Sequence, residues 1–155
     1  MQDKLPEILI TSVHDVFLTF LGMEVFPGKA QEVALVESCQ NNKTVTVVID
    51  VSGDFEGSLH LYCSVVVALR LSSSMANKSF ASMSGEASDV LGELLTLIAK
   101  WFQINSSQIS NISISPAIVV SGNKMEQSQT NSSSCLKQSF KVNEDSFIIE
   151  CLLTN

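Results

Sequence analysis

The chain is poor in charged residues, and basic residues are the scarcer kind. Asp, Glu, Lys and Arg make up 16% of its 155 residues, and nine Lys and Arg stand against 16 Asp and Glu. Disordered chains are rich in charge and poor in apolar residues, so a hydrophobic content of 45% predicts a compact globule. Proteins that bind nucleic-acid phosphates need clustered Lys and Arg, and the net charge of -7 therefore argues against a nucleic-acid partner.

Long apolar runs and paired cysteines are missing as well. No run approaches the roughly 20 apolar residues of a membrane-spanning helix, and M-Q-D-K-L-P-E-I-L-I at the start is acidic where a signal peptide is basic. None of the four cysteines has the Cys-x-x-Cys spacing of a zinc or thioredoxin-like site. We therefore expect a cytoplasmic protein without a membrane partner. We expect small buried or strand residues at Cys39, Cys63, Cys135 and Cys151.

Familiar catalytic motifs are absent from the sequence. It has no glycine-rich phosphate loop ending in Lys-Ser/Thr, no Gly-x-Gly-x-x-Gly, no His-Glu-x-x-His and no Gly-x-Ser-x-Gly. The two histidines, His14 in a predicted helix and His60 in a predicted strand, are too few for a multi-histidine metal site. They also give little material for a histidine-activated nucleophile, so any chemistry must come from other polar residues.

Hydrophobic spacing predicts one α+β domain spanning residues 1–155. Apolar residues at helical spacing predict helices at 5–22, 64–75 and 84–103. A run of β-branched residues predicts a strand at 44–51. Alternating or continuous apolar runs bounded by turn residues predict further strands at 32–36, 56–63, 112–115, 117–120, 136–142 and 146–153, with a turn at 27–29 and a polar loop at 123–134. Pro116 predicts a bulge or bend, because proline cannot donate to a sheet. Helices in blocks between runs of strands predict a mostly antiparallel sheet of about six strands with about three helices packed against it.

The last predicted helix carries a regular line of polar residues. In S-G-E-A-S-D-V-L-G-E-L-L-T-L-I-A-K-W-F-Q, residues 84–103, these residues recur at intervals of three and four: Glu86, Asp89, Glu93, Thr96, Lys100 and Gln103. Such spacing stacks them on one face of a helix, and Ser84 is suited to cap its start. Periodicity alone leaves the role of the line open, because any amphipathic helix has a solvated side on which Glu93 is hydrated or pairs with Lys100.

The same helix carries a resemblance to a known family. Asp89-x-x-x-Glu93-x-x-Thr96 resembles the signature of the CheC/CheX chemotaxis phosphatases, Asp/Ser-x-x-x-Glu-x-x-Asn, commonly with a small residue before the Glu. F-E-G-S-L-H-L and I-S-I-S-P-A-I-V-V-S-G resemble the strands before the middle helix and after the signature helix of that family. The order of elements from Leu5 to Leu153 is similar to CheX, which has one signature copy, whereas CheC has two. Thr96 stands where the family has its catalytic Asn.

The resemblance implies a role in two-component signalling and chemotaxis. Members of the family hydrolyse the aspartyl phosphate of a phosphorylated CheY-like receiver domain, and that partner supplies the phosphoryl group, Mg²⁺ and a Lys. The chain then needs no cofactor of its own. The resemblance makes Glu93 and Thr96 the catalytic positions, with Glu93 pairing with the partner's Lys and residue 96 positioning the attacking water. The partner-binding residues it implies are Glu86, Asp89, Glu93 and Lys100. A hydroxyl at Thr96 reaches less far than an amide, so we expect reduced activity.

Two further hypotheses fit the same residues. In one, a CheX-like module binds a receiver domain through the polar line without efficient hydrolysis. In the other, the chain is a dimerisation domain and the polar line has no role. The resemblance also implies a homodimer that pairs through sheet edges, and the predicted final hairpin, residues 136–153, offers such an edge.

Overall fold

The structure is a computed structural model that describes residues 5–29, 44–54, 56–106, 111–122 and 134–153. The helices in these ranges are α1 (Leu5–Val16), α3 (Val65–Ala76) and α4 (Gly85–Asn105), with a turn of π-helix, η2 (Phe17–Leu21), directly after α1. The strands are β1 (Phe26–Pro27), β2 (Thr44–Gly53), β3 (Gly57–Ser64), β4 (Ile112–Ile114), β5 (Ile118–Gly122), β6 (Ser134–Val142) and β7 (Asp145–Leu153). These elements confirm the predicted α+β class.

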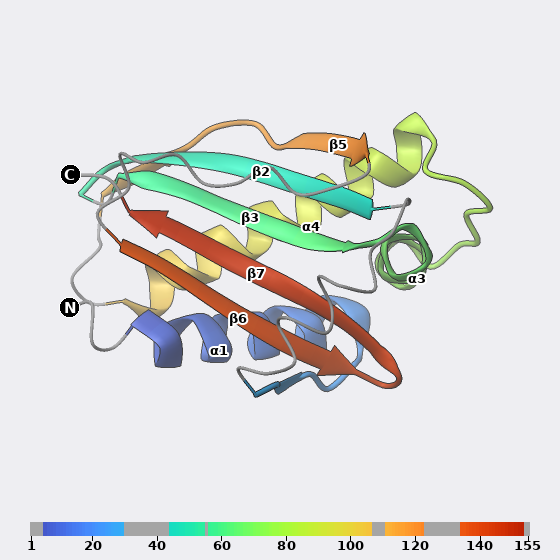
Figure 1. The fold of residues 1–155 in the computed structure, drawn as a ribbon, viewed down its shortest axis with the longest axis horizontal. Coiled ribbons are helices and arrows are strands. Elements are labelled where there is room, and N and C mark those ends of the chain that lie inside the picture. The colour runs from blue at the N-terminus through green and yellow to red at the C-terminus, as the bar shows by residue number, and fades with distance from the viewer. Residues whose placement is uncertain (1–4, 30–43, 55, 107–110, 123–133, 154–155) are drawn as a thin grey trace.

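The described strands form one antiparallel sheet. Its order is β1-β6-β7-β3-β2-β4, and β5 also pairs with β2. In Figure 1, α1 and α4 lie behind the sheet, so one face of the sheet carries these helices. This arrangement confirms the expected mostly antiparallel sheet with helices packed against it.

Strand β2 turns one face toward the core, and it confirms the strand that its run of β-branched residues predicts. Val45, Val47 and Ile49 are fully buried and belong to the hydrophobic core. Asp50, on the other side of the pleat, is exposed. The register with β3 sets Val47 opposite Leu61, which is also fully buried. Alternation along β2 therefore decides which face of the sheet receives the helices.

The first helix ends as predicted, at Gly22. This glycine has φ +68°, a left-handed conformation that favours glycine, and its N–H bonds to the carbonyl of Phe17. Phe17 is buried and stacks on Phe147 of β7 with ring centres 5.2 Å apart. Phe147 in turn stacks on Phe140 of β6 at 5.4 Å. These stacked rings pack η2, which follows α1, against the hairpin formed by β6 and β7.

A bulge separates β4 from β5. β4 ends opposite Val51 and β5 resumes opposite Val48, so residues 115–117 stand opposite only two residues of β2. Ser115 fastens the bulge to Asp50: the Ser115 N–H donates to the Asp50 carbonyl at 2.9 Å, and the Asp50 N–H donates to Oγ of Ser115 at 2.9 Å. The bulge predicted at the proline is confirmed.

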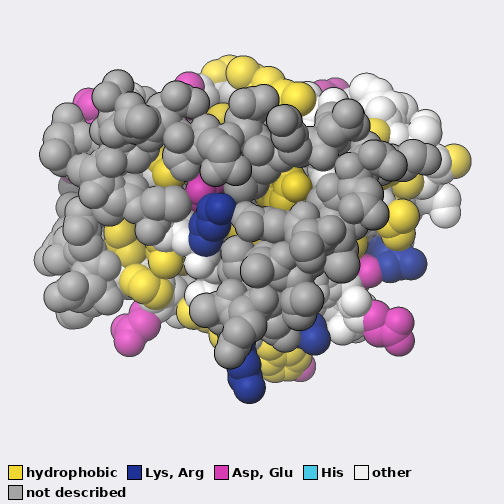
Figure 2. Space-filling view, viewed as in Figure 1, with side chains coloured by type: hydrophobic (Ala, Val, Ile, Leu, Met, Phe, Trp, Pro, Cys, Tyr) yellow, Lys and Arg dark blue, Asp and Glu magenta, His cyan; other side chains and the backbone are white. Residues whose placement is uncertain are grey.

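Strand β5 carries exposed apolar side chains. Ile118 is 62% exposed and Val120 is 53% exposed. Figure 2 shows hydrophobic side chains at the upper edge of the molecule, where β5 lies in Figure 1. Exposed apolar residues on a strand at the end of a sheet are candidates for pairing with another chain.

The connection after α1 contains a strand that the sequence pattern did not indicate. This strand is β1, which includes Pro27, the first residue of the turn predicted at 27–29, and pairs with the end of β6. Two residues are too short for a periodic signal, and only their partner strand defines them. The predicted strand at 32–36, and all but the last residue of the predicted loop at 123–134, lie outside the described residues.

Candidate functional site

The predicted line of polar residues lies on α4. Ser84 precedes the helix in an extended conformation, and its Oγ accepts a hydrogen bond from the N–H of Ala87 at 3.2 Å, which confirms the predicted cap. The apolar side of α4 packs on the sheet and on α1. Its buried residues are Ala87, Leu91, Gly92, Leu94, Leu95, Ile98, Ala99 and Phe102. With this side buried, the polar side faces outward.

The outward side of α4 carries the six residues that we call the polar stripe: Glu86, Asp89, Glu93, Thr96, Lys100 and Gln103. All four charged side chains are exposed, whereas the side chains of Thr96 and Gln103 are partly buried. The three acids lie in the first half of the helix, where the helix dipole favours negative charge. The structure therefore brings all the predicted site residues onto one helix face.

Glu93 lies in the middle of the polar stripe. It forms no ion pair with Lys100, and none of the other described residues bonds to its carboxylate. The ion pair between Glu93 and Lys100, which would give Glu93 a purely structural role on the helix surface, is therefore not formed. An exposed carboxylate of this kind can pair with a cation brought by another molecule.

Thr96 is held by its own helix. Its Oγ1 donates a hydrogen bond to the carbonyl oxygen of Gly92, one turn earlier, at 3.0 Å. Threonine hydroxyls inside helices commonly bond back in this way. The single hydroxyl proton is thus used within the helix, while the oxygen lone pairs can still accept a hydrogen bond.

A match to a family model decides the family. Residues 45–141, more than half of the chain and all of α4, match the family model described as chemotaxis phosphatase CheX. The chain belongs to the CheX family. No curated protein sequence matches it closely.

Solved structures of CheX and CheC-like proteins share the fold over almost their whole length. A CheC-like superfamily protein from Shewanella sp. PV-4 is 20% identical, with a TM-score of 0.79 and full coverage of both chains. Chemotaxis protein CheX from Vibrio vulnificus is 18% identical with a TM-score of 0.78, covering 97% of this chain and 96% of that one. CheX in the CheX-CheY-BeF3-Mg²⁺ complex from Borrelia burgdorferi is 18% identical with a TM-score of 0.72, covering 96% and 97%. These likenesses establish a common fold.

The three signature positions predicted from the family resemblance, Asp89, Glu93 and Thr96, fall on the polar stripe. Asp89 and Glu93 are exposed, whereas Thr96 is partly buried and bonds to its own helix.

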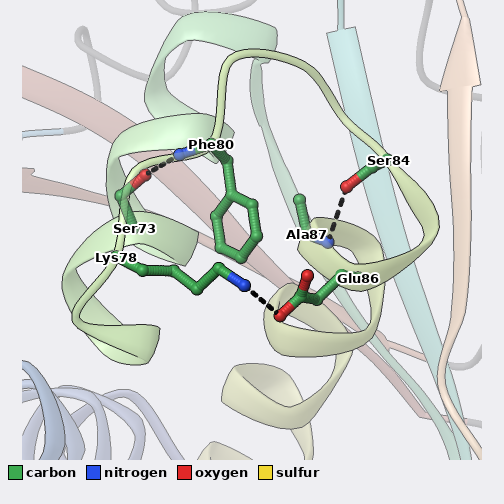
Figure 3. Close-up of polar contacts among 6 residues, drawn as sticks. All are labelled: Ser73, Lys78, Phe80, Ser84, Glu86 and Ala87. Atoms are coloured by element: carbon green, nitrogen blue, oxygen red, sulfur yellow. Dashed lines mark hydrogen bonds and ion pairs between the residues drawn. The ribbon is translucent and has the colours of Figure 1, made fainter.

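The first residue of the polar stripe is engaged by the connection between α3 and α4 (Figure 3). Nζ of Lys78 lies 2.7 Å from Oε2 of Glu86 and 5.5 Å from the centre of the Phe80 ring. The Phe80 N–H donates to Oγ of Ser73 at 3.2 Å, which ties the connection to α3. Sequence reasoning did not foresee this pair, because a contact across an irregular connection leaves no periodic pattern. Glu86 is thus a partner-binding candidate that already has an ion-pair partner.

Apolar side chains border the polar stripe on the side that faces η2. Trp101 contacts Phe20 edge to face, with ring centres 5.4 Å apart and planes at 89°. Phe20 is 38% exposed, Leu97 and Trp101 are half-buried, and Ile104 near the helix end is 70% exposed. The helical spacing of Leu97 and Trp101 does not indicate that they remain accessible, because the same spacing is found in buried residues. The accessible face of α4 is therefore polar along its centre and apolar along one margin.

The two histidines lie on other elements. His14 of α1 has Nδ1 3.7 Å from Oδ1 of Asp15, and His60 of β3 has Nδ1 3.4 Å from Oε1 of the buried Glu150 on β7. In the described ranges, no three His, Cys, Asp or Glu side chains gather where they could hold a metal ion. None of the described helices is both long and apolar enough to cross a membrane.

Two cysteines are buried strand residues with free thiols, as predicted: Cys63 on β3 and Cys151 on β7. Burial, reinforced by the nearby charge of Asp145, raises the pKa of the Cys63 thiol from 9.0 to about 12. Cys63 therefore stays protonated in the folded protein at neutral pH. Cys39 lies outside the described residues, and for Cys135 only its place on β6 is described.

Proposed function

We propose that this CheX-family chain docks α4 on the phosphorylated receiver domain of a CheY-like response regulator and promotes hydrolysis of its aspartyl phosphate. The observation that carries the proposal is that Glu93, at the predicted signature position of α4, is exposed and has no bonding partner among the described residues. The Borrelia burgdorferi relative forms a CheX-CheY-BeF3-Mg²⁺ complex, which supports a receiver domain as the partner.

The proposed reaction is an in-line displacement by water. The water oxygen attacks phosphorus, the bond between phosphorus and the aspartyl oxygen breaks, and its electron pair leaves with the carboxylate. The products are the free Asp and inorganic phosphate, which takes up the water protons that are not released to solvent. The receiver supplies the phosphoryl group, Mg²⁺ and a Lys, and this chain contributes no cofactor. Its contribution is positioning, which is the main part of catalysis in phosphoryl transfer.

Two residues of the polar stripe act in this reaction. Glu93 pairs with the receiver's Lys and so registers α4 against the phosphorylated site. Thr96 faces the attacking water and accepts one of its protons in a hydrogen bond through Oγ1. An Asn amide offers a donor and an acceptor at longer reach, so Thr96 orients water less well. Loss of one oriented hydrogen bond to a reacting group costs on the order of 10²-fold in rate, which sets the reduction we expect.

The other charged residues of the polar stripe contribute to docking. Asp89 and Lys100 lie one and two turns from Glu93 and are exposed. Glu86 must either keep Lys78 in the complex or exchange it for a cation of the receiver. The Lys78–Glu86 pair is about half exposed on both sides, and exposed pairs contribute only about 0–1 kcal/mol, so the exchange is not a barrier.

The test is a timed loss of phosphate from a phosphorylated receiver domain of the same organism. The expected result is decay faster than the spontaneous rate, with Glu93→Gln returning the decay close to that rate. Decay at the spontaneous rate in the presence of saturating, receiver-bound protein would remove the phosphatase hypothesis. It would leave a CheX-like module that binds the receiver without hydrolysis. The bond from Thr96 to Gly92 favours that second candidate, because it uses the only hydroxyl proton.

Homodimer formation is a further part of the proposal. β6, the outer strand of the final hairpin, is paired at its end by β1, and the Gly28 N–H donates to the Ser139 carbonyl at 2.8 Å. The opposite end of the sheet, where Ile118 and Val120 of β5 are exposed, is therefore the better candidate edge. In the dimerisation hypothesis this edge is the functional surface.

A cytoplasmic location also belongs to the proposal. A receiver domain of a response regulator is a cytoplasmic partner. The free thiols of Cys63 and Cys151 fit a reducing compartment.

A further inference from the structure

Gly92 lies in the middle of the 21-residue helix α4, where glycine is among the least favourable residues. The position is buried and faces β5. A methyl group on Gly92 would lie 3.1 Å from Cβ of Ala117 and 3.9 Å from Cγ2 of Val119. The first distance is tighter than ordinary carbon contacts, which lie near 3.5–4.0 Å. Glycine therefore allows α4 to lie closer to the sheet than any other residue would.

The surface that faces Gly92 is held firmly. Ala117 is the last residue of the bulge between β4 and β5, and two hydrogen bonds between Ser115 and Asp50 join the bulge to β2. A side chain added at position 92 would therefore contact Ala117 too closely, and the hydrogen-bonded bulge has little freedom to move away. Bulges often re-aim a side chain beside a functional site, and this one presents Ala117 to the helix.

Gly92 is also connected to both signature residues. It precedes Glu93 in the chain, and its carbonyl oxygen accepts the hydrogen bond from Oγ1 of Thr96 at 3.0 Å. A displacement of the peptide group at Gly92 therefore moves the backbone of Glu93 and the hydrogen bond that orients Thr96. The packing contact and the candidate site share one turn of helix.

We propose that Gly92 and Ala117 are positioning residues: their close contact sets the height of α4 above β5, and with it the placement of Glu93 and Thr96. The effect on rate rests on the proposed phosphatase function, whereas the effect on placement does not. A helix displaced by a few tenths of an ångström would present the polar stripe out of register with a rigid partner site.

The variants that test this are Gly92→Ala, Ala117→Gly and the double substitution. Gly85→Ala is the matched control, because it adds the same methyl group to the same helix at a position with nothing within 4 Å. If the contact sets the helix, removing the methyl group of Ala117 restores the space that Gly92→Ala fills. A substitution that acted only through helix propensity would show no such rescue.

The first measurement is independent of activity. In ¹H–¹⁵N spectra, Gly92→Ala should shift the amide signals of Glu93, Thr96 and Val119, and the added Ala117→Gly should return those of Thr96 and Val119 toward wild type. Gly85→Ala should leave all three unchanged. Equal shifts in the single and double variants would overturn the proposal. If Gly92→Ala does not fold, recovery of the fold in the double variant supports the contact, and failure of both overturns it.

The second measurement is phosphate loss from the phosphorylated receiver. Gly92→Ala should lower the maximal rate about ten-fold, since small misplacements of catalytic groups have effects of this order or larger, and the double variant should recover most of it. The receiver concentration at half-maximal rate should rise by a smaller factor, because Glu93, which docks the receiver, is displaced together with Thr96. An unchanged rate for a well-folded Gly92→Ala would overturn the positioning role. If the wild type does not accelerate phosphate loss, the proposed function fails, and the amide shifts alone decide the placement.

Discussion

The hydroxyl of Thr96 bonds to the carbonyl of Gly92 within the same helix, at 3.0 Å. Thr96 is the residue that the signature resemblance predicts to replace an Asn, and this bond holds its side chain against the helix. Because the hydroxyl proton is already donated, Oγ1 of Thr96 can only accept a hydrogen bond from an incoming water. The chemistry of the proposed site therefore depends on how much positioning one hydroxyl acceptor provides.

Replacing Thr96 by Asn should raise the rate of receiver dephosphorylation by up to about 10²-fold, because a lost oriented hydrogen bond to a reacting group costs on this scale. The amide reaches further from the helix and supplies both a donor and an acceptor to the water. Phosphate release from a pre-phosphorylated receiver, with wild type and variant at equal saturation, measures the gain.

The matched control for this experiment is Thr96→Val, which keeps the shape and removes the hydroxyl. It should lower the rate below wild type if the hydroxyl holds water, and leave binding unchanged. A Thr96→Asn variant that binds the receiver as tightly as wild type and gains no rate would show that the helix docks without catalysing.

Glu93→Gln should weaken binding of the phosphorylated receiver by roughly ten-fold, because it replaces a charge-assisted hydrogen bond, valued at about 1.5–3 kcal/mol, by a neutral one. Glu7→Gln makes the same change of charge at an exposed position in the first turn of α1 and should leave binding unchanged. Titration of labelled receiver by fluorescence anisotropy measures both. Equal affinities for the two variants would count against docking through the polar stripe.

Local signals predicted the site helix well. Its start follows from a Ser84 side chain that can accept an N–H, and its orientation from apolar spacing that repeats over five turns. Strand β2 is similar, since a run of β-branched residues selects an extended backbone whatever its partner. These features depend on neighbours within one element, which is the range that a sequence pattern describes.

Contacts between elements were not predictable in the same way. The pairing of β1 with β6 rests on two residues, and the Lys78–Glu86 pair crosses an irregular connection. The contact of Gly92 with Ala117 requires a register between a helix and a strand that no local spacing encodes. The glycine itself was visible in the sequence as an unfavourable residue in a helix interior, and such a residue is a signal of close packing.

Folding stability should fall above pH 9 because of Cys63. The folded thiol has a pKa of about 12 against 9.0 for an unburied thiol, so only the unfolded state ionises between these values. Below pH 9 this thiol does not lower the free energy of unfolding. As the pH rises from 9 toward 12, ionisation of the unfolded state lowers that free energy by up to about 1.4 kcal/mol per pH unit. Cys63→Val removes the titrating group and should lose less stability between pH 8 and 10, by about 1 kcal/mol. Urea unfolding at both pH values measures the difference, and identical pH dependence of the two proteins would contradict it.

The dimer prediction concerns the exposed edge at β5. Light scattering should give a mass near twice the 16.8 kDa of the chain. Val120→Lys should shift it to a single chain, because a charged side chain on an edge strand opposes pairing with a second copy. Val66→Lys on α3 is the matched control, since Val66 is 55% exposed and Val120 is 53% exposed. It should leave the dimer intact, which separates loss of the β5 edge from a general gain in surface charge. A wild-type mass of one chain refutes the dimer, and a dimer that survives Val120→Lys moves the interface away from β5.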